Sequence, residues 1–160
     1  MRVTSFDPFV SADQMAAIGV EKVESLDDGL KEADFVTIQL HLTPETRGMF
    51  STERFHIMKK TAALINLSRG PVVDQVALYT ALKNGEIAAA ALDVFEKEPP
   101  EQNEPLFSLP NVILTPHFGG DTYEAKQRIS TKAAENIILA LEGEDTYNWA
   151  NRQAMQAARK

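Results

Sequence analysis

An apolar run that passes directly into polar residues and a sharp turn occupies residues 62–71, which read AALINLSRGP. Short apolar runs of this kind alternate with amphipathic segments along the chain, and that alternation is typical of a parallel sheet with crossover helices. We therefore predict an α/β fold with helices on both faces of a parallel sheet. The predicted strands span residues 2–6, 20–23, 35–40, 62–66, 87–92 and 112–114.

Residues with side chains that cap helices mark the predicted helix starts. The predicted helices span residues 13–17, 25–33, 51–57, 74–83 and 121–143. Ser25, Ser51, Asp74 and Asp121 take the capping positions, and Gly85 supplies a left-handed stop after the fourth helix. The longest helix carries an apolar stripe of Ile129, Ala133, Ile137 and Leu141. The tail from Asn148 is either a frayed helix or a segment that docks elsewhere, and the prolines of residues 98–110 predict no regular structure there.

Composition limits the classes of function. The 160 residues contain 16 Lys and Arg against 23 Asp and Glu, a net charge of −7, and the basic residues are scattered. Nucleic-acid and membrane partners are therefore not expected, because a basic face would supply most of that affinity. The chain has no cysteine, which excludes disulfides and thiolate chemistry, and no metal site is predicted. We expect a soluble cytoplasmic protein.

Three polar residues follow three successive apolar runs. Arg69, Glu98 and His117 would all lie where ligands collect in an open α/β sheet, outside the carboxyl ends of the strands. Arg69 would either capture a substrate carboxylate or pair with Asp74 on the surface. Glu98 would either hold the histidine or be one more exposed acid, and His117 suits proton transfer near neutral pH.

Two carboxylates and two further histidines are weaker candidates for ligand binding. Asp7 would either accept hydrogen bonds from a ribose or form an Asp-Pro turn. Asp93 would either contact a nicotinamide amide or cap the following turn. His41 could line a cofactor groove, whereas we interpret His56 as structural.

Four blocks in order carry a family resemblance: LTPETRG (42–48), LINLSRG (64–70), ALDVFEKEP (91–99) and NVILTPHFGG (111–120). The chain resembles the NAD-binding domain of the D-isomer-specific 2-hydroxyacid dehydrogenases. The resemblance implies a Rossmann-like sheet and NAD as cofactor. It also implies an oxidoreductase that acts on the CH–OH group of a D-2-hydroxy acid, of the 3-phosphoglycerate or hydroxypyruvate/glyoxylate type.

The resemblance also implies a role for each matched residue. Arg69 binds the substrate carboxylate and 2-oxo group, His117 donates the proton to the carbonyl, and Glu98 favours the protonated form of His117. Asp7 takes the adenosine ribose and Asp93 contacts the nicotinamide end. The residues expected to line the cofactor groove are Gln39, Leu40, His41, Thr46, Leu67, Ser68, Arg69, His117 and Gly120. Where relatives usually read His-x-Pro, this chain has Gln39-Leu40-His41.

A larger departure concerns the glycine-rich phosphate loop. In this fold the loop precedes the ribose-binding acid by about 20 residues, yet here that acid is Asp7 and no Gly-x-Gly occurs. We therefore expect the first strand, the phosphate loop and the first helix to be missing, with most of the substrate domain. Residues 1–143 would form a partial NAD-binding domain and residues 144–160 a C-terminal tail.

Loss of a central strand would expose two inner strand edges. Three outcomes are then open. The chain is an inactive fragment, or residues 2–6 pair directly beside residues 35–40, or a partner chain supplies the missing strand. The expected partners are a small 2-hydroxy or 2-oxo acid and either a second copy or a strand donor. The alternative function is a catalytically inactive remnant that serves as a binding or dimerisation module.

Overall fold

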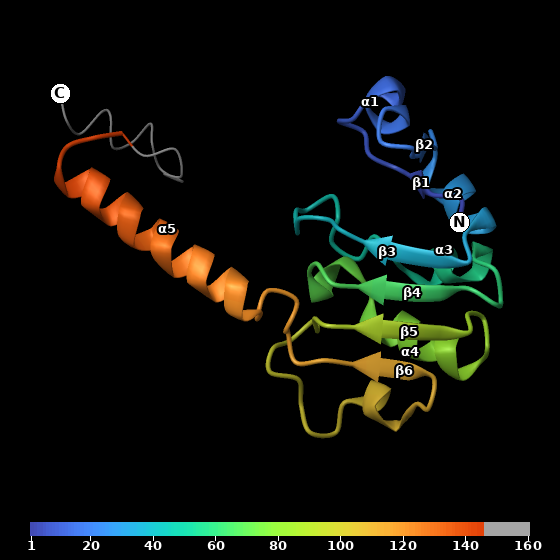
Figure 1. Ribbon diagram of the computed structural model, residues 1–160. Helices are drawn as coiled ribbons and strands as arrows, with labels where there is room; N and C mark the ends of the chain where they lie inside the picture. The colour runs from blue at the N-terminus through green and yellow to red at the C-terminus, as the bar shows by residue number, and fades with distance from the viewer. Residues whose placement is uncertain (146–160) are drawn as a thin grey trace. The chain divides into compact units, whose positions relative to one another are not determined.

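The computed structural model describes residues 1–145 and divides the chain into two compact units, Met1–His117 and Phe118–Lys160. The first unit contains two parallel sheets (Figure 1). One pairs β1 (Thr4–Ser5) with β2 (Glu21–Lys22). The other has the order β3 (Phe35–Ile38), β4 (Ala63–Asn66), β5 (Ala89–Leu92) and β6 (Val112–Leu114). The predicted α/β fold with a parallel sheet is confirmed.

The last residues of the four long-sheet strands lie in register. Ile38 pairs with Asn66, Asn66 with Leu92, and Leu92 with Leu114. All four strands are parallel, so the segments after them leave the same edge of the sheet. The sheet therefore places the loops after β3, β4, β5 and β6 along one line.

The strands differ from the prediction at their ends. The strand predicted at residues 112–114 is observed as such, whereas the other five are shorter than expected. The apolar runs extend past the residues that pair, because a side chain can be buried beside a sheet without joining its ladder. Of the three alternatives for the missing strand, the pairing of residues 2–6 beside residues 35–40 is not observed: β1 pairs with β2, in a separate sheet, and β3 pairs with β4.

The helices of the first unit are α1 (Ala12–Ala16), α2 (Leu26–Glu32), α3 (Thr52–Ile57) and α4 (Gln75–Lys83). Ser25 and Asp74 accept hydrogen bonds from backbone N–H groups of the first turn, as predicted. Ser51 occupies the capping position of α3 but does not cap it, because its hydroxyl donates to Glu53 instead. Gly85 has φ of +68° and follows α4 as the predicted stop.

The second unit contains α5 (Tyr123–Leu141). Its capping residue is Thr122, whose hydroxyl accepts from the Ala125 N–H at 3.1 Å. The predicted cap, Asp121, is therefore off by one position, because two adjacent residues can both cap and the sequence does not separate them. The tail from Asn148 lies outside the described residues.

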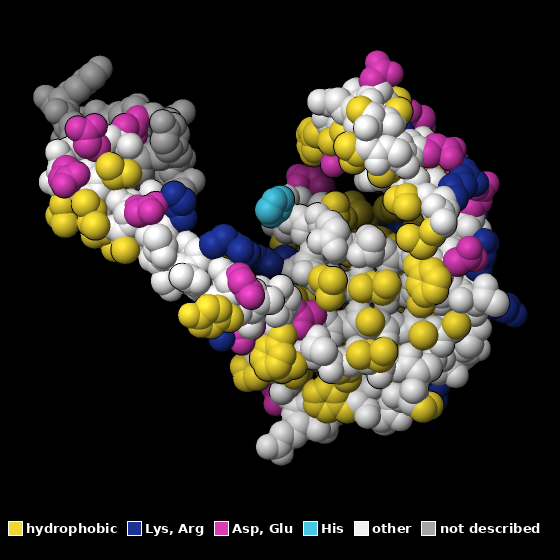
Figure 2. Space-filling view, viewed as in Figure 1, with side chains coloured by type: hydrophobic (Ala, Val, Ile, Leu, Met, Phe, Trp, Pro, Cys, Tyr) yellow, Lys and Arg dark blue, Asp and Glu magenta, His cyan; other side chains and the backbone are white. Residues whose placement is uncertain are grey.

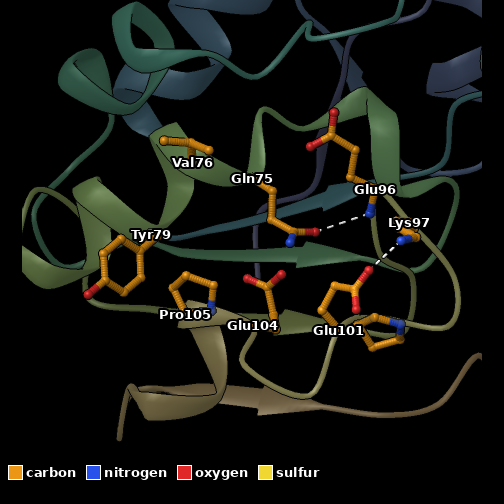
Figure 3. A pocket seen from close by; sticks show the side chains of 9 residues that line it. Gln75, Val76, Tyr79, Glu96, Lys97, Glu101, Glu104 and Pro105 are labelled. Atoms are coloured by element: carbon orange, nitrogen blue, oxygen red, sulfur yellow. Dashed lines mark hydrogen bonds and ion pairs between the residues drawn. The ribbon is translucent and has the colours of Figure 1, made fainter.

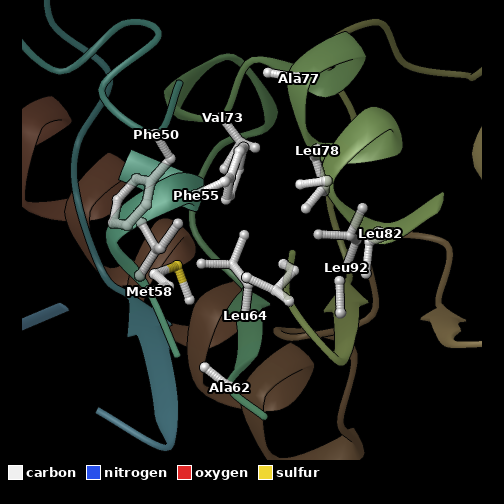
Figure 4. Close-up of a cluster of buried hydrophobic side chains, with 14 of the residues drawn as sticks. Phe50, Phe55, Met58, Ala62, Leu64, Val73, Ala77, Leu78, Leu82 and Leu92 are labelled. Carbon is white, nitrogen blue, oxygen red and sulfur yellow. The ribbon is translucent and has the colours of Figure 1, made fainter. Parts of the chain in front are cut away.

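The core covers one face of the β3–β6 sheet. Phe55 of α3, Met58 just after it and Leu78 of α4 pack with inward side chains such as Leu64 and Leu92 (Figure 4). Full burial of each such side chain contributes about 1.5–3 kcal/mol to folding. Leu30 of α2 joins the same cluster, so α2, α3 and α4 share one face of the sheet.

The other face of this sheet carries apolar side chains that the first unit leaves accessible. Phe35 and Ile113 are 68% and 70% exposed, and hydrophobic side chains are spread over this face in Figure 2. The residues of β4 and β5 that point the same way are only half-buried. The helices α2, α3 and α4, which carry residues of the core cluster, pack on the opposite face of the sheet.

The proline-rich segment after β5 is more regular than predicted. Residues Pro105–Ser108 form a short 3-10 helix, with Glu104 accepting from the Leu106 N–H. Proline is tolerated in a first helical turn because its missing N–H would have no partner there. In the described part of the chain, no helix has the length and apolar character needed to cross a membrane.

Candidate active site

Asn66, the last residue of β4, organises the turn that carries Arg69. It is 1% exposed, and its Oδ1 accepts from both the N–H and the hydroxyl of Ser68, each at 3.0 Å. Its Nδ2 donates to the carbonyl oxygen of Arg69 at 3.0 Å. A buried amide that uses both ends in this way fixes the backbone on either side of the turn.

Gly70 brings this turn against the loop that follows β5. A Cβ added at Gly70 would lie 1.8 Å from the carbonyl oxygen of Phe95 and 2.5 Å from the N atom of Glu96. Both contacts are to backbone, which cannot swing aside as a flexible side chain can. Only glycine therefore allows the Arg69 turn to approach the segment that carries Glu98.

Glu98 links that segment to the loop after β6. Its Oε1 accepts from the Phe95 N–H at 2.9 Å, and its Oε2 lies 2.8 Å from Nδ1 of His117. Because an ionised carboxylate only accepts, Nδ1 of His117 carries the proton of this bond. The other ring nitrogen, Nε2, is then the one that a substrate can meet.

Opposing effects set the charge state of Glu98. Partial burial raises the pKa of this carboxyl, but the Phe95 N–H bond, the bond and charge of His117 and the charge of Arg69 together lower the pKa below its ordinary value. The influence of the guanidinium places Arg69 within electrostatic reach of the Glu98–His117 pair. Glu98 is thus ionised near neutral pH and can accept the N–H of His117.

His117 has an unusual backbone. Its φ is +59°, the left-handed region, and it is the one residue other than glycine with positive φ among residues 1–145. Side chains other than glycine adopt this conformation at a cost of about 1–2 kcal/mol. Strained residues of this kind are concentrated at functional sites, where the surrounding structure imposes them.

The surface alternative for Arg69 is not what the structure shows. Asp74 accepts the Ala77 N–H at 2.9 Å as the cap of α4, and no Arg69–Asp74 ion pair is present among the described residues. The Nη1 atom of Arg69 donates to the carbonyl oxygen of Ser68 at 2.6 Å. Arg69 is exposed, so the rest of its guanidinium can meet a ligand.

Asp93 follows β5 and is almost fully buried, at 3% exposed. The hydroxyl of Thr115 donates to its Oδ1 at 2.5 Å, and its N–H donates to the Asn66 carbonyl. These bonds join the ends of β4, β5 and β6. Asp93 therefore holds the strand ends together, beside any contact it makes with a ligand.

The remaining residues predicted to bind the cofactor lie in three places. Those that follow β3 and β4 lie at the same sheet edge as Arg69; they are Gln39, Leu40, His41, Thr46, Leu67 and Ser68. Among them, Thr46 donates to the carbonyl of His41 at 2.7 Å and so shapes the loop after β3. Asp7 follows β1 in the small sheet and accepts the Phe9 N–H at 2.8 Å, which is the Asp-Pro turn. Gly120 belongs to the second unit.

A hollow of about 370 Å³ lies beside the Glu98–His117 pair. Apolar side chains line most of it, including Phe95, Phe107 and Leu114. The rings of Phe95 and Phe107 meet edge to face, with centroids 6.1 Å apart. These apolar side chains thus form a wall beside the pair, whose own side chains remain 51% and 38% exposed.

A second hollow of about 300 Å³ lies on the other side of the same loop, against α4 (Figure 3). Gln75 accepts the Glu96 N–H at 3.1 Å, and Lys97 pairs with Glu101. The Gln75 bond ties the loop of Glu98 to the start of α4, and the Lys97–Glu101 pair lies within the loop. His56 lies elsewhere, with Nδ1 2.8 Å from the Thr52 carbonyl, in keeping with its structural interpretation.

Three residues that fix the positions of the site side chains were not predicted from the sequence. Asn66, Gly70 and Thr115 were noticed only as parts of motifs or turns, yet they fix the positions of Arg69, Glu98 and Asp93. A polar side chain at the end of an otherwise apolar strand is the signal that points to Asn66. No local signal distinguishes a turn-forming glycine from one in close backbone contact.

Comparison with known proteins identifies the family of the chain. The profile of the D-isomer specific 2-hydroxyacid dehydrogenase NAD binding domain matches residues 1–119. The chain is 45% identical to D-3-phosphoglycerate dehydrogenase of Methanocaldococcus jannaschii over 151 residues, which cover 94% of this chain and 29% of that protein. It is 44% identical to glyoxylate reductase of Korarchaeum cryptofilum over 156 residues, covering 98% of this chain and 47% of that protein.

Solved structures give the same result. A D-isomer specific 2-hydroxyacid dehydrogenase from Lactobacillus delbrueckii ssp. bulgaricus, in its NAD-complexed form, superposes with a TM-score of 0.82 at 28% identity. The match covers 94% of this chain and 48% of that one. A Thermus thermophilus protein gives a TM-score of 0.85 at 37% identity over 92% of this chain and 45% of that one. The chain thus spans less than half of each relative, and it belongs to the D-isomer specific 2-hydroxyacid dehydrogenase family, within its NAD-binding domain.

Proposed function

We propose that this chain carries the reaction centre of an NAD-dependent oxidoreductase that acts on the CH–OH group of a D-2-hydroxy acid. The observation that supports this most is the Glu98–His117 pair, 2.8 Å between Oε2 and Nδ1, within electrostatic reach of Arg69. Reduction of a 2-oxo acid requires a cation that binds the substrate carboxylate and an acid that donates a proton to the carbonyl oxygen. Arg69 and His117 can take these two roles, and the Glu98 carboxylate can stabilise the protonated His117. We propose substrates of the 3-phosphoglycerate or hydroxypyruvate/glyoxylate type, as in the names of the relatives.

The donor set fits the nicotinamide end of NAD better than the pyrophosphate. The buried Asp93 and the loops after β3 and β4 line one sheet edge, and His117 lies there with Nε2 directed away from Glu98. Asp7 follows β1, where an acid can meet a ribose. Residues 1–145 contain no glycine-rich loop of backbone donors for the phosphates.

The residues act together in the proposed reduction. NADH, when bound, supplies the hydride that adds to the carbonyl carbon. Arg69 binds the substrate carboxylate and orients the 2-oxo group, and His117 gives the proton on Nε2 to the carbonyl oxygen. Glu98 stabilises the imidazolium before the transfer and holds the ring in place afterwards. In the oxidation direction, neutral His117 takes the proton back.

The test follows NADH absorbance with hydroxypyruvate and with glyoxylate. We expect turnover by the chain, reduced about 10²–10⁴-fold in His117→Asn. Asparagine suits the test because it tolerates the left-handed backbone of residue 117. His56→Asn is the matched control and should keep the rate. A well-folded chain with no turnover would instead support the binding or dimerisation module.

A further inference from the structure

An apolar groove lies between α4 and the loop that follows β5; it is the hollow of about 300 Å³ in Figure 3, and we call it the α4 groove. Its walls are mostly apolar and are formed by Val76, Tyr79, Pro100 and Pro105. The groove opens to solvent along α4, where Val76 is 74% exposed. Sites for small molecules usually enclose most of their ligand. The open form instead suits a chain segment that lies across the groove and continues at both ends.

The charges that line the α4 groove are unbalanced. Three of its side chains are acidic and one is basic: Glu96, Glu101, Glu104 and Lys97. Lys97 pairs with Glu101. Glu96 and Glu104, in contrast, form no ion pair with any residue of 1–145. Two carboxylates beside an apolar wall therefore lack a cation, and complementary charge favours a basic occupant.

Other groups in the groove offer contacts for a peptide backbone and for a cation. The Oε1 atom of Gln75 accepts the Glu96 N–H at 3.1 Å, whereas its Nε2 makes no hydrogen bond within the described residues. This Nε2 can donate to a carbonyl oxygen of an occupant. The ring of Tyr79 already attracts a cation, since Nζ of Lys83 lies 5.4 Å from its centroid.

We propose that the α4 groove is a docking site for a basic segment of a partner protein, in which an apolar side chain is flanked by Lys or Arg. The apolar side chain lies against Val76, Tyr79 and Pro105, and the flanking cations meet Glu96 and Glu104. Extended peptides are commonly bound in this way, with backbone hydrogen bonds for affinity and side-chain contacts for specificity. The docking does not depend on the proposed reaction.

The α4 groove shares a wall with the hollow beside the Glu98–His117 pair. Pro100 lines both of them, and Glu98 lies between Pro100 and the groove residue Glu96 along the chain. A partner in the groove therefore contacts the segment that carries Glu98 without entering the proposed reaction centre.

The test is a titration of the isotope-labelled full chain with synthetic peptides, followed by NMR of the backbone amides. The peptides are acetyl-Gly-Arg-X-Lys-Gly-amide, where X is leucine, phenylalanine or valine. We expect at least one of them to give saturable shifts at Val76, Tyr79 and Glu96. Peptides with glutamate in place of arginine and lysine should give none. Glycine at X should weaken binding by about tenfold or more, because the buried apolar side chain is lost.

Variants separate the groove from the overall negative charge of the chain. Glu96→Gln combined with Glu104→Gln should weaken binding by about tenfold, because both unpaired carboxylates are removed. The amide oxygen of a glutamine at position 104 can still accept the Leu106 N–H, so the loop keeps that bond. Glu124→Gln combined with Glu142→Gln changes the net charge equally on α5 and should leave the dissociation constant unchanged.

Four results would each overturn the proposal. They are no saturable shift with any of the three basic peptides, equal binding of the acidic peptides, equal weakening by the two double variants, and binding of argininamide as tight as that of the peptides. The last result would assign the groove to a small cation rather than to a protein segment.

Discussion

The two sheets of the first unit differ in how firmly they hold the polar residues at their strand ends. Beyond β4, the buried side chain of Asn66 fixes its own turn, and Asp93 joins the ends of β4, β5 and β6 through its N–H to the Asn66 carbonyl and its carboxylate to Thr115. Beyond β1, by contrast, Asp7 is held by one local bond to the Phe9 N–H, and Met15 is the only buried residue of 1–29. Similar polar residues at strand ends are therefore fixed where the sheet is covered by helices and loosely placed where it is not.

The largest effect expected from this difference is in the free energy of unfolding. Phe55→Ala, at a fully buried ring under the long sheet, should destabilise the chain by about 3–5 kcal/mol, because it removes buried surface and leaves a cavity. Phe9→Ala is the matched control beside the small sheet, where the ring is 94% exposed. Urea unfolding of both variants measures the difference. Equal losses would mean that the two regions are equally packed.

A smaller effect is expected at the backbone contact of the active site. Gly70→Ala should cost about 1–3 kcal/mol, because the new methyl group would collide with the Phe95 carbonyl and push the Glu98 loop away from Arg69. It should also lower turnover. Gly120→Ala is the control for stability alone, since a Cβ there meets nothing within 4 Å, whereas its position in the expected cofactor groove excludes it as a control for turnover. A Gly70→Ala chain with wild-type stability and rate would refute the close approach.

The smallest effect concerns pH. The pKa of Glu98 is lower in the folded chain than its ordinary value of 4.5, so its stabilising contribution is present above that pH. The contribution is lost as the pH falls below 4.5 and through the folded pKa. The stability advantage of wild type over Glu98→Gln should therefore shrink across this range, by under about 1 kcal/mol for so exposed a pair. Urea midpoints from about pH 6 to about pH 3 measure it. A constant difference would contradict the Glu98–His117 bond.

Local signals explain what the sequence could predict. Apolar runs and capping residues such as Asp74 act over a few residues, so the parallel sheet and the start of α4 are readable directly. The local sequence pattern did not distinguish Glu98 from the acidic residues around it, whereas the family resemblance did. In the structure Glu98 contacts His117, 19 positions away. The contact of Gly70 with Phe95 joins segments 25 residues apart, and no short-range pattern encodes it.

The central claim is that Arg69, Glu98 and His117 are held in position before a ligand binds, whereas residues 1–145 contain no glycine-rich loop for the pyrophosphate. Calorimetric titration of the chain with reduced nicotinamide mononucleotide and with NADH tests it directly. We expect dissociation constants within about tenfold of each other, since the adenosine and second phosphate add little. A micromolar dissociation constant for NADH, about a hundredfold below that of the mononucleotide, would contradict this claim. A hundredfold difference in dissociation constant corresponds to about 2.7 kcal/mol of binding free energy.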